Sequence, residues 1–401
     1  MNSLDKELLE AGRRALSNAA KEMPVLNGLL EYATSSRPLE GARIAGCVHL
    51  TKETGVLINL LQVAGAEIVW TGGDEVSTQN EIAAVLRQRG VTIFGWRNML
   101  TAEVQAALRS TLDHFVDGPT IIIDNGARLV KAAIDAPERF PNLKFLTEKT
   151  TEGCAELREI AKRQVLPFPI LLVNDVVTKW EVDNTFGTGQ STVDGILRAT
   201  GKLLAGKVFV VCGFGHVGRG IALRAAGQGA RVVICCRSAE TAIKATLAGY
   251  EVLPLEKAVS KADILCTATG VPNVVRSEHL ALAKHNITLC NTGHSVTEID
   301  VSALEAMATA RTIRTDLVTS YTLANGNELN LIARGGLVNL AAAAGNPSEV
   351  MDVTFCNQAL SVFGAQFAQG ALEPRLHEIS DEQDEDVAAR KLHAMGLRCD
   401  E

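Results

Sequence analysis

The sequence predicts an α/β protein with two doubly wound domains, each built on a parallel sheet, with one domain inserted into the other. Short apolar runs of strand length alternate with amphipathic helical segments through most of the chain. The length of 401 residues exceeds what one ordinary core accommodates. Hydrophobic residues make up 47% of the chain and aromatic residues only 4%, so the cores are expected to consist of Val, Leu, Ile and Ala.

The first half of the chain contains the alternating elements of one such domain. Strands are expected at 42–49, 67–71, 91–95, 120–124 and 169–173, and helices at 52–64 and 79–88. In a parallel sheet the carboxyl ends of the strands lie along one edge, and ligands bind outside that edge. Polar residues lie at the carboxyl ends of three of the expected strands: His49, Asp124, Asn125, Asn174 and Asp175. We therefore expect a binding site at this edge.

A glycine-rich loop marks the second domain. Residues 208–212 form an apolar run of β-formers, and residues 213–218 have the spacing Gly-x-Gly-x-x-Gly. A helix at 219–229 and a strand at 230–236 complete a βαβ unit, which disfavours the alternative of a purely structural turn. The glycines let the backbone approach a pyrophosphate at the N-terminus of the helix, where unpaired N–H groups favour anions. The pattern predicts a Rossmann domain that binds NAD or NADP.

Further strands at 264–268 and 288–291 each end in a turn that is placed to face this cofactor. Cys236 stands where an NAD site usually has an acidic residue that binds the adenosine ribose, and Arg237 and Ser238 follow it. An uncharged residue followed by a guanidinium suits a 2′-phosphate, so the sequence favours NADP over NAD. The residues expected to contact the cofactor in this domain are Gly213, Gly215, His216, Val217, Gly218, Cys236, Arg237, Ser238, Thr269, Gly270, Thr292 and Gly293.

Charge and cysteine usage limit the partners and the compartment. The net charge of −7 argues against nucleic acid or an anionic membrane as a partner. The nine cysteines are scattered, mostly in apolar runs, without a Cys-x-x-Cys pair or a histidine cluster at metal spacing. We expect no metal, no membrane-spanning segment and a cytoplasmic location. The acidic segment 378–386 is expected to be a surface appendage.

Several blocks of residues, in matching order and spacing from about Gly41 to Phe355, carry a family resemblance. They are His49-Leu50-Thr51-Lys52-Glu53-Thr54, Ser77-Thr78-Gln79, Thr150-Thr151, Asn174-Asp175-x-Val177-Thr178-Lys179, Asp183-Asn184, Gly293-His294 and Leu337-Val338-Asn339-Leu340. With these blocks the chain resembles the S-adenosylhomocysteine hydrolase family.

The resemblance implies a division of the chain. It implies a substrate (nucleoside) domain whose first part is 1–184, a Rossmann NAD(P)-binding domain at 185–340, a return helix at 341–376 that completes the substrate domain, and a short C-terminal tail at 377–401. It also implies a homodimer or homotetramer that acts on a small adenine nucleoside.

The resemblance further implies a reaction in which NAD oxidises the ribose 3′ carbon, so that the 4′ C–H becomes acidic and a group on the 5′ carbon can be eliminated. Lys179 would take the 3′-hydroxyl proton, Asp183 would hold the ribose hydroxyls, and His49 would protonate the departing 5′ group. The adenine would be read by Thr51 and Glu53. The cofactor or ribose would be contacted by Thr150, Thr151, Asn184, His294 and Asn339.

Each residue taken alone has a simpler interpretation. His49 could be an ordinary loop histidine, Lys179 a residue of a solvated turn, and Glu53 a first-turn carboxylate favoured by the helix dipole. The order and spacing of the whole set favour the functional interpretation.

Four positions depart from what the family resemblance implies. Asn125 stands in place of a catalytic Asp, Lys149 in place of a Glu that touches the ribose, Thr188 in place of a Cys near the nicotinamide, and Asn346 in place of a His against the adenine. An amide cannot accept the proton that a carboxylate would accept, and a lysine has no acceptor for a ribose hydroxyl. Asn125 is kept as a catalytic candidate, and Lys149 and Asn346 as substrate-binding candidates.

These departures suggest an altered sugar or leaving group, with loss of water as the nearest variant. The hypothesis is an NAD(P)-dependent nucleoside dehydratase, a lyase, of nucleoside-antibiotic biosynthesis. Three alternatives remain: an adenosylhomocysteinase, a nucleoside 3′-dehydrogenase or epimerase, and a non-catalytic regulator that senses a nucleotide.

Overall fold

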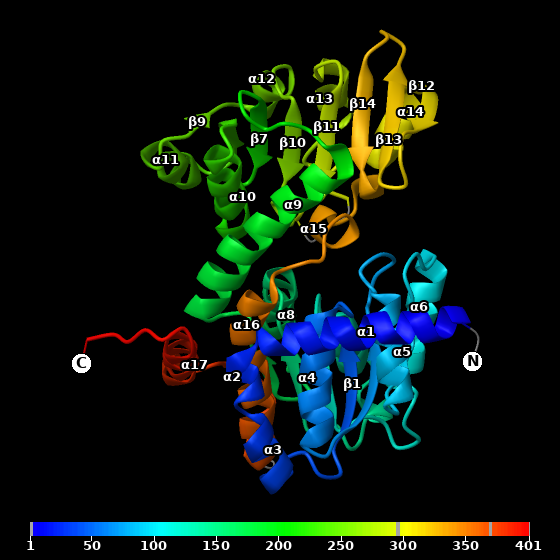
Figure 1. Cartoon of the computed structure of the whole chain (residues 1–401), viewed down its shortest axis with the longest axis vertical. Coiled ribbons are helices and arrows are strands. Elements are labelled where there is room, and N and C mark those ends of the chain that lie inside the picture. Colours follow the sequence, from blue (N-terminus) through cyan, green and yellow to red (C-terminus); the bar gives the residue numbers. More distant parts are fainter. Residues whose placement is uncertain (1–2, 294–296, 369–370, 401) are drawn as a thin grey trace. The chain divides into compact units, whose positions relative to one another are not determined.

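The computed structural model describes residues 3–293, 297–368 and 371–400. It contains two compact units (Figure 1): residues 1–180 with 348–401 form unit 1, and residues 181–347 form unit 2. Unit 2 is thus inserted between the two parts of unit 1. Each unit is an α/β structure with helices on both faces of one sheet, as the sequence predicts.

Unit 1 contains a seven-stranded sheet in which every pairing is parallel, with the strand order β15-β6-β5-β4-β1-β2-β3. Its strands are β1 Arg43–Cys47, β2 Glu67–Thr71, β3 Thr92–Ile93, β4 Ile121–Asp124, β5 Phe145–Glu148, β6 Ile170–Leu172 and β15 Leu376–Glu378. Its helices are α1 Ser3–Lys21, α2 Pro24–Asn27, α3 Leu30–Ser36, α4 Lys52–Val63, α5 Asn80–Gln88, α6 Thr101–Leu112, α7 Arg128–Asp135, η1 Pro137–Arg139, α8 Thr151–Arg163, α16 Ser348–Phe367 and α17 Asp381–Ala394.

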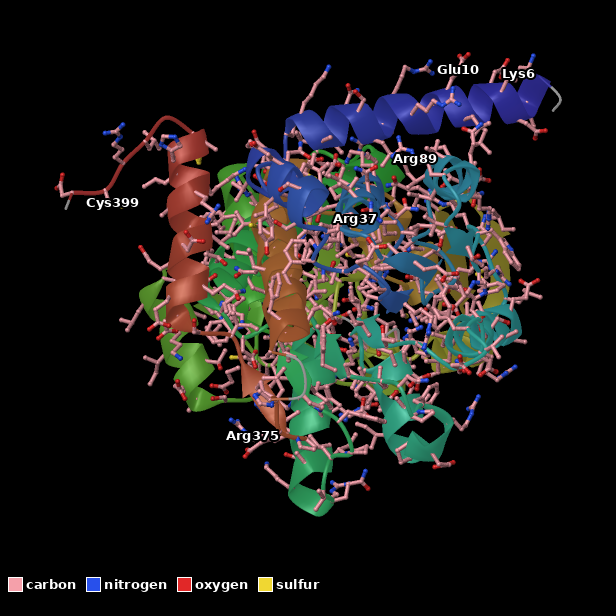
Figure 2. All side chains as sticks on the ribbon, turned by 90° about the horizontal axis from the view of Figure 1, so that it is seen from below. Lys6, Glu10, Arg37, Arg89, Arg375 and Cys399 are labelled. Carbon is pink, nitrogen blue, oxygen red and sulfur yellow. The ribbon has the colours of Figure 1, made fainter. Side chains whose placement is uncertain are left out.

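The side chains of β4 contribute to the hydrophobic cores on both faces of the sheet. Ile121 and Ile123 pack into the core beneath α1, α4, α5 and α16, whereas Ile122 packs into the core beneath α7 and α8, because successive side chains of a strand point to opposite faces. Helix α1 lies on α4 and α5 and keeps Lys6 and Glu10 on its outer side, as Figure 2 shows. Leu9 on its inner side is buried.

Unit 2 contains an eight-stranded sheet with the order β12-β13-β14-β11-β10-β7-β8-β9. Its strands are β7 Val208–Cys212, β8 Arg231–Cys235, β9 Glu251–Val252, β10 Ile264–Thr267, β11 Ile287–Asn291, β12 Ala308–Ile313, β13 Val318–Leu323 and β14 Glu328–Ile332. Its helices are α9 Gly189–Thr200, α10 His216–Gly227, α11 Ala239–Leu247, α12 Leu255–Val259, α13 Ser277–Leu282, α14 Val301–Met307, η3 Ala333–Gly335 and α15 Val338–Ala341. The pairings from β14 to β9 are parallel, and β12 and β13 add an antiparallel edge.

The segment η2, Lys179–Thr188, is a π-helix that begins in unit 1 and continues in unit 2. It carries Lys179, Asp183 and Asn184. Hydrogen bonds to i−5 are rare and occur mostly as short bulges near functional sites. Ten residues in this conformation therefore mark the segment as specialised.

The expectation of a surface appendage at 378–386 is wrong. Helix α17 packs on α2 and α16, and its Val387 is fully buried. The Asp384 carboxylate accepts hydrogen bonds from the Thr178 backbone N–H at 3.0 Å, from the Thr178 hydroxyl, and from Asn357 Nδ2 at 2.8 Å. One carboxylate of this acidic segment, that of Asp384, therefore connects α17 by hydrogen bonds to Thr178, the residue before Lys179.

Replacing Asp384 by Ala is expected to lower the free energy of unfolding by about 2–3 kcal/mol, because buried hydrogen bonds to a charged acceptor are lost and their donors are left unpaired. Asp386→Ala is the matched control: its exposed ion pair with Arg390 is worth roughly 0–1 kcal/mol. Urea denaturation followed by circular dichroism measures both. Equal effects of the two substitutions would contradict the structural role of Asp384.

Candidate active site

Polar side chains gather at the carboxyl ends of the unit 1 strands. His49 follows β1, and its Nδ1 lies 2.6 Å from Asp74 Oδ2 and 2.9 Å from Ser77 Oγ, both in the loop after β2. The Ser77 hydroxyl also donates to Asp74 at 2.5 Å. Burial opposes ionisation of Asp74, but the His49 charge and hydrogen bonds from His49 and Ser77 outweigh it and lower the pKa of this carboxyl.

Two buried carboxylates at the same edge are turned towards the backbone. Asp124, which ends β4, accepts from the N–H groups of Asn125, Leu129 and Val130 at 2.8, 2.6 and 2.9 Å. Glu148, which ends β5, accepts from residues 126, 127 and 150 at 3.0, 2.8 and 2.7 Å. Burial raises the pKa of Glu148, and burial with the nearby Glu148 charge raises that of Asp124.

The residues that follow these two carboxylates have a different chemistry. Asn125 is 8% exposed, and its side-chain Oδ1 has no hydrogen-bond donor within the described chain. Lys149 is 6% exposed, and its Nζ lies 4.7 Å from the centre of the Phe355 ring, a cation–π contact. A buried amide oxygen without a donor costs free energy unless a ligand or water satisfies it. This edge therefore offers an amide and an ammonium group to a ligand.

The start of α4 holds the residues expected to read the base. Thr51 caps the helix by accepting from the Thr54 N–H at 3.5 Å. Glu53 is 1% exposed and accepts from the Ser348 hydroxyl at 2.7 Å, while Lys52 pairs with it from the neighbouring position. Glu53 is therefore held between α4 and the start of α16. The carboxylate of Glu53 is therefore buried, unlike an ordinary carboxylate in the first turn of a helix.

Thr150, Thr151 and Lys179 complete the described site of unit 1. The Thr150 hydroxyl caps α8 by accepting from the Gly153 N–H at 3.0 Å. The Thr151 hydroxyl donates to Asn174 Oδ1 at 3.4 Å, which links the start of α8 to the end of β6. Lys179 is 7% exposed, so the alternative of a solvated turn residue does not hold.

The glycine loop of unit 2 has the geometry of a phosphate cradle. Gly213 has a φ of +102°, and a Cβ there would lie 2.6 Å from the Ala268 carbonyl oxygen. A Cβ on Gly218 would lie 2.1 Å from the Gly213 carbonyl oxygen. A Cβ on Gly215, in contrast, would meet nothing within 4 Å, although this residue caps the N-terminus of α10. The open side of Gly215 is where the backbone can approach a pyrophosphate.

Other predicted cofactor residues surround the same end of the unit 2 sheet. Thr269 and Gly270, after β10, are held by the buried Glu298, which accepts from both backbone N–H groups at 2.5–3.2 Å. Thr292, after β11, is buried and lies 3.1 Å from the Thr192 hydroxyl. Asn339 is 7% exposed and its Oδ1 has no donor within the described chain. A buried acceptor without a donor, in the same unit as the glycine loop, fits a dinucleotide.

The remaining predicted cofactor residues lie as follows. His216 and Val217 begin α10 and are half-buried, and burial lowers the pKa of His216. Cys236 is half-buried after β8, and the Ser238 hydroxyl caps α11. Arg237 between them is exposed. Gly293 follows Thr292, whereas His294 lies outside the described residues. Asn184 is half-buried within η2.

Asp183 and Asn346 are brought together within unit 2, although they lie 163 positions apart. Asn346 Nδ2 donates to Asp183 Oδ1 at 2.6 Å. Its Oδ1 lies 3.0 Å from the Ser191 hydroxyl and 3.3 Å from the Thr188 hydroxyl. Two positions that depart from the family resemblance, 188 and 346, are therefore in contact with each other and with the carboxylate expected to hold the ribose.

Sequence reasoning missed several residues of this site. Asp74 and Glu298 were not candidates, and Ser77 and Ser348 had no assigned role. Asp74 follows a predicted strand by three positions, so the same strand-end argument that selected His49 could have selected it. Glu298 and Ser348 follow no such pattern. In the described part of the chain no three His, Cys, Asp or Glu side chains gather as a metal site requires.

The fold and the site together define a two-domain enzyme with a Rossmann domain for a dinucleotide. Comparison with known proteins makes this specific. Residues 3–139 match the model of the S-adenosyl-L-homocysteine hydrolase family, and residues 184–345 match the model of its NAD binding domain. The chain belongs to the S-adenosyl-L-homocysteine hydrolase family and is an NAD-dependent enzyme.

Individual relatives match over nearly their whole length. The adenosylhomocysteinase of Sulfurisphaera tokodaii is 43% identical over 396 residues, which cover 98% of this chain and 94% of that protein. The S-inosyl-L-homocysteine hydrolase of Methanopyrus kandleri is 39% identical over 399 residues, which cover 99% of this chain and 93% of that protein. Among solved structures, a dipicolinate synthase chain from Bacillus halodurans aligns with a TM-score of 0.51 at 13% identity, covering 81% of this chain and 99% of that one, a likeness of fold alone. No helix within the described residues is both long and apolar enough to span a bilayer.

Gly215→Ala is expected to leave unit 2 folded and to weaken NAD binding about tenfold or more, because the added methyl group occupies the open side of the cradle. Gly227→Ala is the matched control, since a Cβ there also meets nothing within 4 Å but lies at the far end of α10. Isothermal titration of the cofactor-free proteins with NAD measures both. Unchanged affinity in Gly215→Ala would contradict the placement of the pyrophosphate.

Proposed function

We propose that the protein removes water from the 5′ side of an adenine nucleoside by transient oxidation at the 3′ carbon, elimination and re-reduction. The product would be a nucleoside with a 4′,5′ double bond. The proposal rests mainly on the chemistry at the ends of β4 and β5. Asp124 and Glu148 accept hydrogen bonds from backbone N–H groups, and the side chains that follow them are the buried amide of Asn125 and the buried ammonium group of Lys149.

These two side chains suit an altered sugar. The Lys149 ammonium group donates hydrogen bonds and cannot accept them, so it recognises sugar oxygens as acceptors. Asn125 offers a neutral oxygen in place of a proton-accepting carboxylate. Both changes affect the recognition of the sugar and the proton transfers, whereas the chain keeps Lys179, Asp183 and His49 for oxidation and elimination.

Each residue has one task in the proposed reaction. NAD, when bound, takes a hydride from the sugar and returns it. Lys179, which is buried, takes the proton of the 3′-hydroxyl. Asp183, oriented by Asn346, accepts hydrogen bonds from ribose hydroxyls. Glu53 and Thr51 bind the base, and His49 protonates the departing oxygen.

The conversion of angustmycin C to angustmycin A in nucleoside-antibiotic biosynthesis is a dehydration of this kind. Its substrate carries an extra hydroxymethyl group on the anomeric carbon, next to the 2′ oxygen. A lysine in place of a carboxylate at position 149 fits such a change, because the hydroxyl pattern on that side of the sugar differs. We propose angustmycin C as the first substrate to test.

Hydrolysis of S-adenosylhomocysteine is the second candidate, and the relatives named adenosylhomocysteinase favour it. A relative named S-inosyl-L-homocysteine hydrolase indicates that the purine also varies within the family. The test therefore varies the sugar and the leaving group on an adenine nucleoside.

Incubation of the NAD-loaded protein with angustmycin C, adenosine and S-adenosylhomocysteine, followed by mass spectrometry and nicotinamide absorbance, tests the proposal. We expect loss of one water from a nucleoside without net cofactor reduction. Release of homocysteine without any dehydration would instead establish the hydrolase. An oxidised or epimerised nucleoside would indicate a dehydrogenase or epimerase, and a cofactor that no nucleoside reduces would indicate a regulator.

Lys179→Ala is expected to slow cofactor reduction by roughly 100-fold or more, because the base for the 3′-hydroxyl is lost. His49→Ala should permit reduction but slow elimination. Lys131→Ala, at an exposed lysine of α7 paired with Glu156, is the matched control. Rapid hydride transfer in Lys179→Ala, measured by stopped-flow absorbance, would refute its role.

We also propose that the cofactor site admits NADP. Arg237 is exposed, two residues after the end of β8 and one before the cap of α11, where a guanidinium can pair with a 2′-phosphate. Arg237→Ala is therefore expected to weaken NADP binding about tenfold or more and to leave NAD binding within about twofold. Titration of wild type and variant with both cofactors measures this. Equal losses for NAD and NADP would exclude a phosphate-specific role.

A further inference from the structure

The loop after β2 gives His49 a buried carboxylate partner. Asp74 is 9% exposed and lies 2.6 Å from His49 Nδ1. Its other oxygen accepts from the backbone N–H groups of Val76 and Ser77, each at 2.7 Å. The carboxylate is therefore fixed by its own loop before it contacts the imidazole, and it does not depend on a flexible side chain for its position.

This arrangement determines which nitrogen of His49 carries the proton. An ionised carboxylate accepts hydrogen bonds and donates none, so Nδ1 must carry the proton that it shares with Asp74 and Ser77. In the neutral imidazole, Nε2 then has a lone pair that can accept a proton. When Nε2 does accept one, the adjacent negative charge stabilises the imidazolium, which is the logic of a carboxylate–histidine pair in general acid–base catalysis.

The charged groups around His49 have other partners. Lys52 and Glu53 on α4 pair with each other, and Glu53 also accepts from Ser348. Asp124, at the end of the adjacent strand, is turned to backbone N–H groups. Asn125 beside it cannot take up a proton. Elimination from an oxidised sugar requires a base for the 4′ proton, and the imidazole supported by Asp74 is suited to that task.

We propose that Asp74 is a positioning residue that makes His49 a single proton carrier, with Nε2 taking the proton from sugar carbon 4′ and delivering it to the departing 5′ oxygen. The C4′–H bond breaks and its electron pair forms the second bond between C4′ and C5′. The C5′–O bond breaks, and the oxygen leaves as water with the carried proton. His49 ends in the state in which it began, and no proton or electron is gained or lost. This inference rests on the proposed function.

The test compares Asp74→Asn with wild type, using the full-length NAD-loaded protein and the nucleoside that wild type dehydrates. Three rates are measured: cofactor reduction, incorporation of solvent deuterium at C4′ of recovered substrate, and product formation. Asp74→Asn should leave cofactor reduction within about twofold and lower the other two rates by roughly 100-fold. Glu75→Gln removes a neighbouring carboxylate that accepts from Thr101 and should change none of the three.

Two outcomes would overturn the role of Asp74. One is unchanged deuterium incorporation and product formation in Asp74→Asn. The other is an equal fall in all three rates, which would indicate a general disturbance of the site. If wild type dehydrates no nucleoside but cleaves S-adenosylhomocysteine, the proposed function fails, and deuterium incorporation during that cleavage decides the role of Asp74 by the same criterion.

A measurement without turnover keeps the inference testable if Asp74→Asn does not fold or wild type is inactive. Nitrogen-15 NMR of labelled wild type reports the tautomer of each histidine, and the loss of one signal pair in His49→Gln assigns His49. The proton is expected on Nδ1. A neutral His49 with its proton on Nε2 would overturn the inference.

Discussion

The two buried carboxylates at the ends of β4 and β5 constrain the rest of the substrate site. Each would carry a large desolvation cost, and each offsets it by accepting several backbone N–H groups around the start of α7 and α8. Asp124 and Glu148 therefore organise the loops and are not available to a ligand. The residues that follow them, Asn125 and Lys149, are placed at the edge by this arrangement, and their chemistry defines what the site can bind.

The repeating part of the fold could be predicted from the sequence because it depends on local pattern. The structure confirms strands at the predicted places for β1, β2, β4, β6, β7, β8, β10 and β11. Strand β5, Phe145–Glu148, was missed because it has four residues and ends in two polar ones. The exposed strand β12 was missed because burial, which gives strands their apolar pattern, is absent there. Helix α17 was misjudged because its burial depends on contacts distant in sequence.

The individual side chains of the site could be predicted where they follow a strand, but their partners could not. Strand ends lie along one edge by topology, so His49 and Asn125 were identifiable. The contact of Glu53 with Ser348 joins residues 295 positions apart, and nothing in a single sequence records such a pairing. The glycine loop could be predicted from the sequence alone. Its function depends on a backbone conformation and a close approach that only glycine allows, so the spacing of the glycines identifies the loop.

The contact between positions 188 and 346 explains why two departures from the family resemblance occur together. Asn346 donates to Asp183 while its oxygen faces the hydroxyls of Thr188 and Ser191. A carboxamide donates through its nitrogen and accepts through its oxygen at the same time. Position 346 uses both, because it has an acceptor on one side and hydroxyl groups on the other. A thiol at position 188 would be a weaker partner for the amide than a hydroxyl. Thr188 and Asn346 therefore belong to one hydrogen-bond network, and that network holds the carboxylate of Asp183 in place.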